Sequence, residues 1–97
     1  MAQSTSVDTQ ALRAVCERLL DHLERTVGAS VDLDADYFWS IEPAARFDME
    51  SEPSSFTIGQ LSDCWTNVQS MDDDSILSYG LVWLAEILRT IGEKVVR

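Results

Sequence analysis

The sequence predicts an all-α or mostly α domain: a small bundle of three main helices, with an extended aromatic segment between the first and the second. Three observations predict this fold. Apolar residues recur at three- and four-residue steps over three stretches, which places them on one face of a helix. Residues 31–41 instead alternate between apolar and polar, which is typical of an extended segment. The length of 97 residues suits a single core.

The first helix is expected over residues 8–27, after a flexible N-terminus of residues 1–7. Asp8 or Ser6 is a suitable N-cap, and Gly28 suits the C-terminal end. His22 lies at the edge of the apolar face and has no second His or Cys at ligand spacing, so we interpret it as a surface residue. The apolar face comprises Leu12, Val15, Cys16, Leu19, Leu20, Leu23 and Val27.

The extended segment carries three consecutive aromatic residues. No hairpin turn with a second alternating run follows it, so we expect either an arm laid across the helices or a short strand that pairs with a second copy. The aromatic rings either anchor this segment in the core or form an exposed binding patch. The candidate interaction surface comprises Tyr37, Phe38, Trp39, Asp32, Asp34 and Asp36.

A search for catalytic and metal-binding patterns returns none that is complete. Asp32, Asp34 and Asp36 are spaced like the start of a calcium loop, but Tyr37 and Pro43 stand where that loop needs Gly and Glu. One histidine and two cysteines at apolar positions do not make a set of nucleophile and base. We therefore predict no catalytic residue, no metal site, no cofactor and no enzymatic activity.

The second helix is expected over residues 58–71, within one domain that spans residues 8–97. Thr57 and Gln60 have the spacing of a capping box, and Phe56 is placed to pack on Leu61 as a hydrophobic staple. Ile58, Leu61, Trp65 and Val68 then share one face. Four residues are thus predicted to be structural: Thr57, Gln60, Leu61 and Trp65.

The third helix is expected over residues 75–95. Asp72–Asp74 come directly before it, and their negative charges favour a helix N-terminus there. It is apolar almost all round, since Tyr79 and Trp83 widen its apolar face and Val82 interrupts its polar strip. Such a helix is buried on several sides. It is either the central element or part of a subunit interface, and we predict a homodimer formed through Tyr79, Val82 and Trp83.

The charge balance decides which partners are expected. The chain has 17 acidic against 7 basic residues, a net charge of -10. It should repel nucleic-acid phosphates and anionic membranes and attract a basic protein. The prediction is a non-enzymatic protein-interaction module, such as an inhibitor or immunity-type protein for a basic partner. The alternatives are acidity that serves solubility alone, a nucleic-acid mimic, and a ligand-binding protein or small enzyme that uses the Tyr37–Trp39 cluster.

The location is expected to be cytoplasmic. The first six residues contain neither a basic region nor an apolar run, so we expect no signal peptide. The most apolar stretch, residues 76–91, includes Glu86 and Arg89 and is short for a membrane span.

Two segments resemble a pattern in short acidic bacterial proteins of unassigned function. They are Asp36-Tyr37-Phe38-Trp39-Ser40-Ile41 and Phe56-Thr57-Ile58-Gly59-Gln60-Leu61-Ser62-Asp63-Cys64-Trp65. The resemblance implies a bacterial source and a compact fold. It implies no activity and no catalytic residue.

Overall fold

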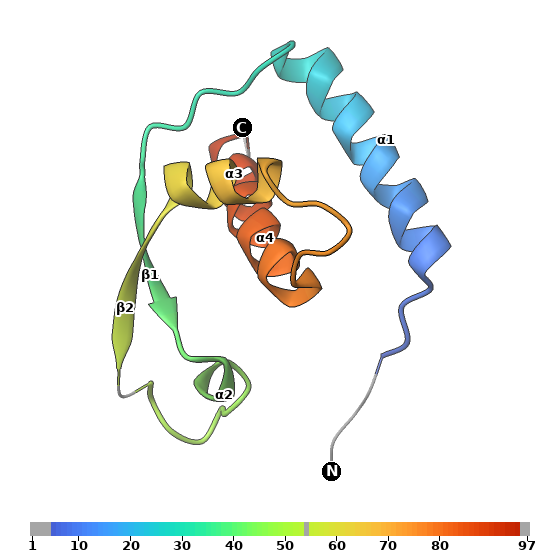
Figure 1. The fold of residues 1–97 in the computed structure, drawn as a ribbon. Coiled ribbons are helices and arrows are strands. Elements are labelled where there is room, and N and C mark those ends of the chain that lie inside the picture. Colours follow the sequence, from blue (N-terminus) through green and yellow to red (C-terminus); the bar gives the residue numbers. More distant parts are fainter. Residues whose placement is uncertain (1–4, 54, 96–97) are drawn as a thin grey trace. The chain divides into compact units, whose positions relative to one another are not determined.

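The structure is a computed structural model that describes residues 5–53 and 55–95. The chain forms two compact units, Met1–Asp32 and Leu33–Arg97. Helix α1 belongs to the first unit, and all other elements belong to the second (Figure 1). The elements in chain order are α1 (Thr9–Val27), β1 (Tyr37–Ile41), α2 (Pro43–Arg46), β2 (Phe56–Gln60), α3 (Leu61–Gln69) and α4 (Leu77–Lys94).

Helix α1 begins and ends where its local capping signals predict. The Asp8 carboxylate accepts a hydrogen bond from the Ala11 N–H at 2.8 Å and caps the N-terminus. Gly28, with a φ of 101° that disfavours other residues, donates its N–H to the Glu24 carbonyl at the C-terminus. Among the described residues its own unit contains no second helix or strand that could pack against the apolar face.

Strands β1 and β2 form an antiparallel sheet within the chain. The register runs from Tyr37 opposite Gln60 to Ile41 opposite Phe56, and α2 lies in the connection. The alternation in residues 31–41 therefore did indicate a strand. The partner strand was not predicted: β1 pairs with β2 of the same chain.

The prediction of a three-helix bundle is wrong. The second unit is a mixed α/β structure in which residues 56–60 form a strand and α3 spans only Leu61–Gln69. Phe56, Thr57 and Ile58 are aromatic or β-branched residues that favour a strand once a partner strand is present. The proposed capping box is also wrong, because Thr57 lies opposite Ser40 in the sheet. The N-cap residue is Gln60, and its side chain makes no capping hydrogen bond to α3.

The core of the second unit lies where α3 packs against α4. Leu61, Cys64 and Ile87 are buried there. Four partly buried residues surround this cluster: Leu33, Phe38, Trp83 and Ile91. A core of this size leaves much apolar surface exposed, as expected for a small unit.

Gly59 allows the sheet to join this core. The Phe38 ring occupies the space where a Cβ of residue 59, its partner across the sheet, would stand. Because successive side chains of a strand point to opposite faces, Phe38 turns to the core and its neighbours Tyr37 and Trp39 turn away from it.

Candidate functional site

The outward face of the sheet carries four large apolar side chains that are mostly exposed to solvent. We call Tyr37, Trp39, Phe56 and Ile58 the aromatic face. Their exposed fractions are 67%, 69%, 53% and 64%. Trp39 lies directly opposite Ile58, and Tyr37 and Phe56 lie at the two ends of the sheet. Within the described residues, each of these side chains is therefore more than half exposed.

The aromatic face is a shaped surface with a shallow hollow. The rings of Trp39 and Phe56 meet edge to face, with centroids 6.0 Å apart and planes at 74°. The hollow has a volume of about 170 Å³ and is lined by Tyr37, Phe38, Trp39 and Ile58. Pockets for small molecules usually measure about 300–1,000 Å³, so this hollow is smaller than a usual small-molecule pocket.

Asp36, predicted to belong to the interaction surface, instead fixes the start of α3. Its carboxylate accepts hydrogen bonds from the Ser62 N–H at 2.8 Å, the Gln60 Nε2 at 2.7 Å and the Ser62 Oγ at 3.2 Å. Its carbonyl accepts another from the Leu61 N–H at 2.6 Å. These bonds, led by that from Gln60, lower the pKa of Asp36 below its ordinary value.

The other predicted residues of the surface are dispersed. Phe38 faces the core, and the Asp34 carboxylate lies 3.3 Å from Lys94 Nζ while 91% of the Asp34 side chain remains exposed. Asp32 is the last residue of the first unit. Of the six predicted residues, the structure thus brings only Tyr37 and Trp39 together on one exposed surface.

Phe56 and Ile58 are the members of the aromatic face that sequence reasoning missed. Their spacing with Leu61 and Trp65 was interpreted as a helical stripe. The signal for a strand was present, since Phe56 and Ile58 alternate with Thr57 and Gly59. Trp65, expected on the buried face of the same helix, is 48% exposed, whereas Leu61 is buried.

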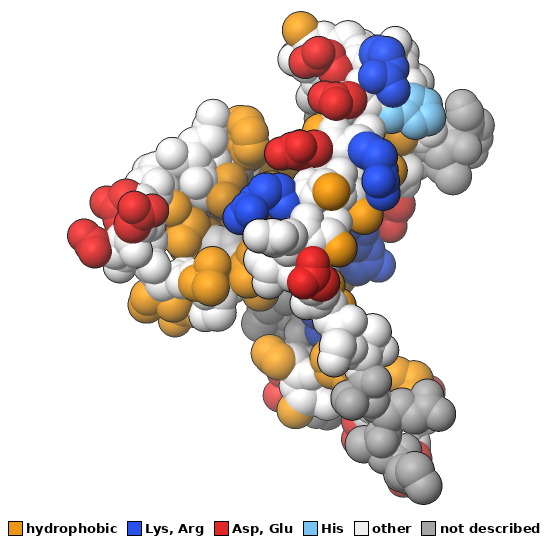
Figure 2. Space-filling view, turned by 90° about the vertical axis from the view of Figure 1, so that its right-hand side faces the viewer, with side chains coloured by type: hydrophobic (Ala, Val, Ile, Leu, Met, Phe, Trp, Pro, Cys, Tyr) orange, Lys and Arg blue, Asp and Glu red, His pale blue; other side chains and the backbone are white. Residues whose placement is uncertain are grey.

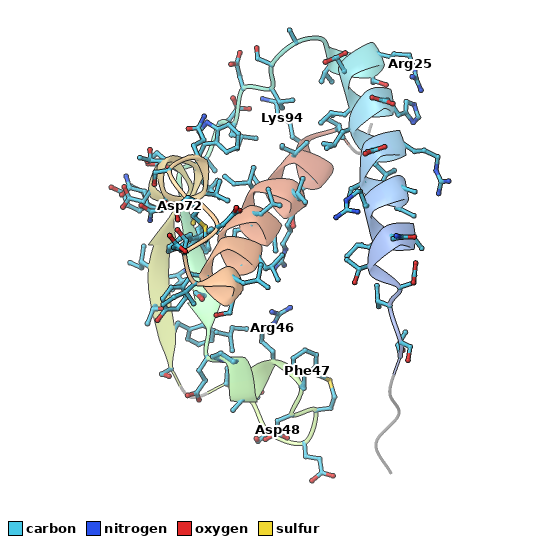
Figure 3. All side chains as sticks on the ribbon, turned by 45° about the vertical axis from the view of Figure 1, so that its right-hand side comes forward. Arg25, Arg46, Phe47, Asp48, Asp72 and Lys94 are labelled. Atoms are coloured by element: carbon cyan, nitrogen blue, oxygen red, sulfur yellow. The ribbon has the colours of Figure 1, made fainter. Side chains whose placement is uncertain are left out.

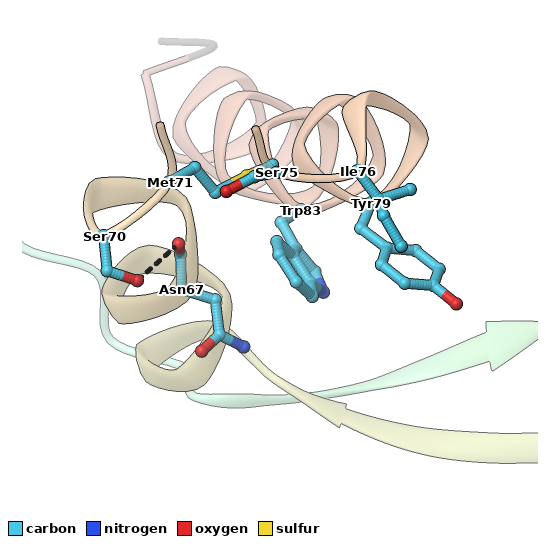
Figure 4. A pocket seen from close by; sticks show the side chains of 7 residues that line it. All are labelled: Asn67, Ser70, Met71, Ser75, Ile76, Tyr79 and Trp83. Atoms are coloured by element: carbon cyan, nitrogen blue, oxygen red, sulfur yellow. Dashed lines mark hydrogen bonds between the residues drawn. The ribbon is translucent and has the colours of Figure 1, made fainter. Parts of the chain in front are cut away.

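A second surface feature lies between the C-terminus of α3 and the N-terminus of α4. This α3–α4 groove has a volume of about 270 Å³, and its lining includes Asn67, Met71, Ile76, Tyr79 and Trp83 (Figure 4). The Tyr79 and Trp83 rings lie 5.7 Å apart with planes at 36°. Of the predicted oligomer interface, Tyr79 and Trp83 therefore line the groove, and Val82 is an exposed residue outside that lining.

The buried Cys64 does not have the environment of an activated nucleophile. Burial raises the pKa of the Cys64 thiol, and the charges of Glu86 and Asp63 raise it further. This thiol stays protonated and packs as a small hydrophobic group. His22 is exposed, and in the described part of the chain no three His, Cys, Asp or Glu side chains are placed to hold a metal ion.

The surface shown in Figure 2 has a mixed character, with acidic side chains interspersed among basic and apolar ones. Within residues 5–53 and 55–95, no helix has the length and apolar character that crossing a membrane requires.

Neither family models, nor curated proteins, nor solved structures give a match to this chain. The resemblance of its two aromatic segments to short acidic bacterial proteins stays a prediction.

Proposed function

We propose that the chain is a non-enzymatic protein-interaction module that binds a basic protein, as an inhibitor or immunity-type protein does, in the cytoplasm. The observation that carries the proposal is the aromatic face, where Tyr37, Trp39, Phe56 and Ile58 are each more than half exposed. A contiguous exposed apolar patch marks an interaction surface. Tyr and Trp are also the residues that most often dominate binding energy at protein interfaces.

The charge supports a basic partner. The chain carries a net charge of -10, and the exposed Glu42 and Glu52 lie in the connection that joins the two strands of the aromatic face. Neither carboxylate takes part in the two ion pairs that the described residues form. An apolar surface on an acidic chain attracts a basic surface over distance and then excludes water at contact.

The two alternative functions have weaker support. A nucleic-acid mimic needs an ordered row of free carboxylates, but those of Asp36, Asp48 and Asp72 accept hydrogen bonds from their own chain. A small-molecule site at the Tyr37–Trp39 cluster would have to use the shallow hollow of about 170 Å³. A protein surface suits this geometry better.

The test is capture of a partner from the native lysate by the tagged chain, compared with two variants. Trp39→Ser removes the largest ring of the aromatic face. Phe47→Ser removes an equally apolar ring that is 81% exposed in the loop after α2 and serves as the matched control (Figure 3). We expect wild type and Phe47→Ser to retain one basic protein at low salt and less of it at moderate salt. Trp39→Ser should retain at least about tenfold less of this protein.

Circular dichroism of both variants checks that the fold is kept. Equal retention by all three proteins, or retention of no specific protein by wild type, would contradict the proposal.

A further inference from the structure

We propose that the α3–α4 groove receives an arginine or lysine side chain of the partner. This inference rests on the proposed function for the basic character of the partner, but the groove is separate from the aromatic face. It would add a second, charge-selective contact to the apolar one.

The first support is the pair of aromatic rings. Tyr79 and Trp83 are one helical turn apart on α4, and Figure 4 shows the Trp83 ring projecting into the space between α3 and α4 with the Tyr79 ring beside it. The faces of aromatic rings carry partial negative charge, and Trp attracts cations most strongly. Trp83 is half-buried and packs against the core cluster, which restricts the orientations of its ring.

The second support is charge complementarity. The loop Asp72–Asp74 joins Met71 to Ser75, and both of those residues line the groove. The Asp72 carboxylate accepts hydrogen bonds from the Asp74 N–H at 3.0 Å and the Ser75 Oγ at 3.2 Å, which fixes the loop. Asp73 and Asp74 are exposed and belong to neither ion pair of the described residues. Asp73 and Asp74 thus place negative charge within two residues of the lining residue Ser75, which favours a cation over an anion in the groove.

The third support is the size and lining of the groove. Its volume of about 270 Å³ is small for a whole ligand but sufficient for one long side chain. Met71 and Ile76 provide apolar walls for an aliphatic stem, and Asn67 adds a polar side chain to the lining. Arginine should be preferred over lysine, because its planar guanidinium also stacks on an aromatic face.

The test uses short capped peptides as probes and the Trp83 indole N–H as the NMR reporter. The peptides are acetyl-Gly-X-Gly-amide with X as arginine, lysine, norleucine or glutamate. We expect the largest saturating shift with arginine, a smaller one with lysine, and little or none with norleucine or glutamate. An equal response to norleucine would show a merely apolar groove, and no response to arginine at concentrations on the order of 10 mM would overturn the proposal.

Variants locate the binding. Tyr79→Ala, at a side chain that is 57% exposed, should lower the affinity for the arginine peptide about fivefold. The double variant Asp73→Asn with Asp74→Asn should lower this affinity by a similar factor. Val82→Ala lies outside the groove lining and should have no effect. An unchanged affinity in both groove variants would contradict the assignment.

The two proposals fail separately. If the lysate partner is captured through Trp39 but the peptides do not bind, the groove assignment is wrong and the proposed function stands. If the arginine peptide binds but no basic protein is captured, the proposed function is wrong and the groove remains a cation-binding surface.

Discussion

Asp36 holds the N-terminus of α3 through both its backbone and its side chain. It supplies acceptors for the N–H groups of Leu61 and Ser62, two of those that a helix leaves unpaired in its first turn. Its negative charge also suits the positive end of the helix. The sequence places this residue 26 positions from Ser62, so no local capping pattern could predict the contact.

The first prediction concerns Asp36→Asn. Because hydrogen bonds lower the pKa of Asp36 in the folded state, its carboxylate stabilises the fold above the unfolded pKa, and this stabilisation is lost as pH falls through the folded pKa. The variant should melt a few degrees lower than wild type at pH 7. Below about pH 4 its stability should fall less than that of wild type, because it has no carboxylate to protonate at residue 36. Thermal unfolding followed by circular dichroism across pH measures both effects.

Asp34→Asn is the matched control for this prediction. Its side chain is 91% exposed in a surface ion pair with Lys94, which contributes little to stability. The control should keep the stability and the acid response of wild type. An identical acid response in wild type and Asp36→Asn would show that this carboxylate does not govern acid stability.

At the scale of elements, the sequence was sufficient to predict the helices and strands whose signals are local. The bounds of α1 follow from Asp8 and Gly28, and β1 follows from its alternation. It was insufficient for β2, because Ile58 and Leu61 fit a helical spacing and only the partner strand decides between the two structures. The aromatic face was therefore half predictable: Tyr37 and Trp39 lie on the recognised strand, and Phe56 and Ile58 on the missed one.

The second prediction concerns how the sheet meets the core. In Gly59→Ala the new methyl group would occupy the space of the Phe38 ring, so the ring must move away from the core. We expect the free energy of unfolding to fall by about 1–3 kcal/mol, measured by urea denaturation.

Gly92→Ala tests whether the position or the substitution itself matters. A Cβ at residue 92 meets no atom within 4 Å, and alanine favours the helix, so stability should rise by up to about 1 kcal/mol. If Gly59→Ala is as stable as wild type, the close packing of Phe38 on Gly59 is not a constraint on the fold.

At the scale of the whole molecule, α4 carries a stripe of leucines that the described residues of its own unit leave exposed. Leu77, Leu81, Leu84 and Leu88 follow one another at steps of four, three and four residues and are 71%, 57%, 37% and 40% exposed. This spacing is that of a coiled-coil seam. The all-round apolar character of α4 predicted either a central helix or an interface, and the residues predicted for the interface were Tyr79, Val82 and Trp83.

The third prediction is a homodimer in which the leucine stripe of α4 packs on that of a second copy. Light scattering at micromolar concentration should give twice the chain mass of 10.9 kDa. Leu81→Glu should give the monomer, because it buries an unpaired carboxylate in the seam. Val82→Glu should remain dimeric. Dissociation by Val82→Glu alone would place the interface at Tyr79, Val82 and Trp83 instead, and a monomeric wild type would refute the dimer.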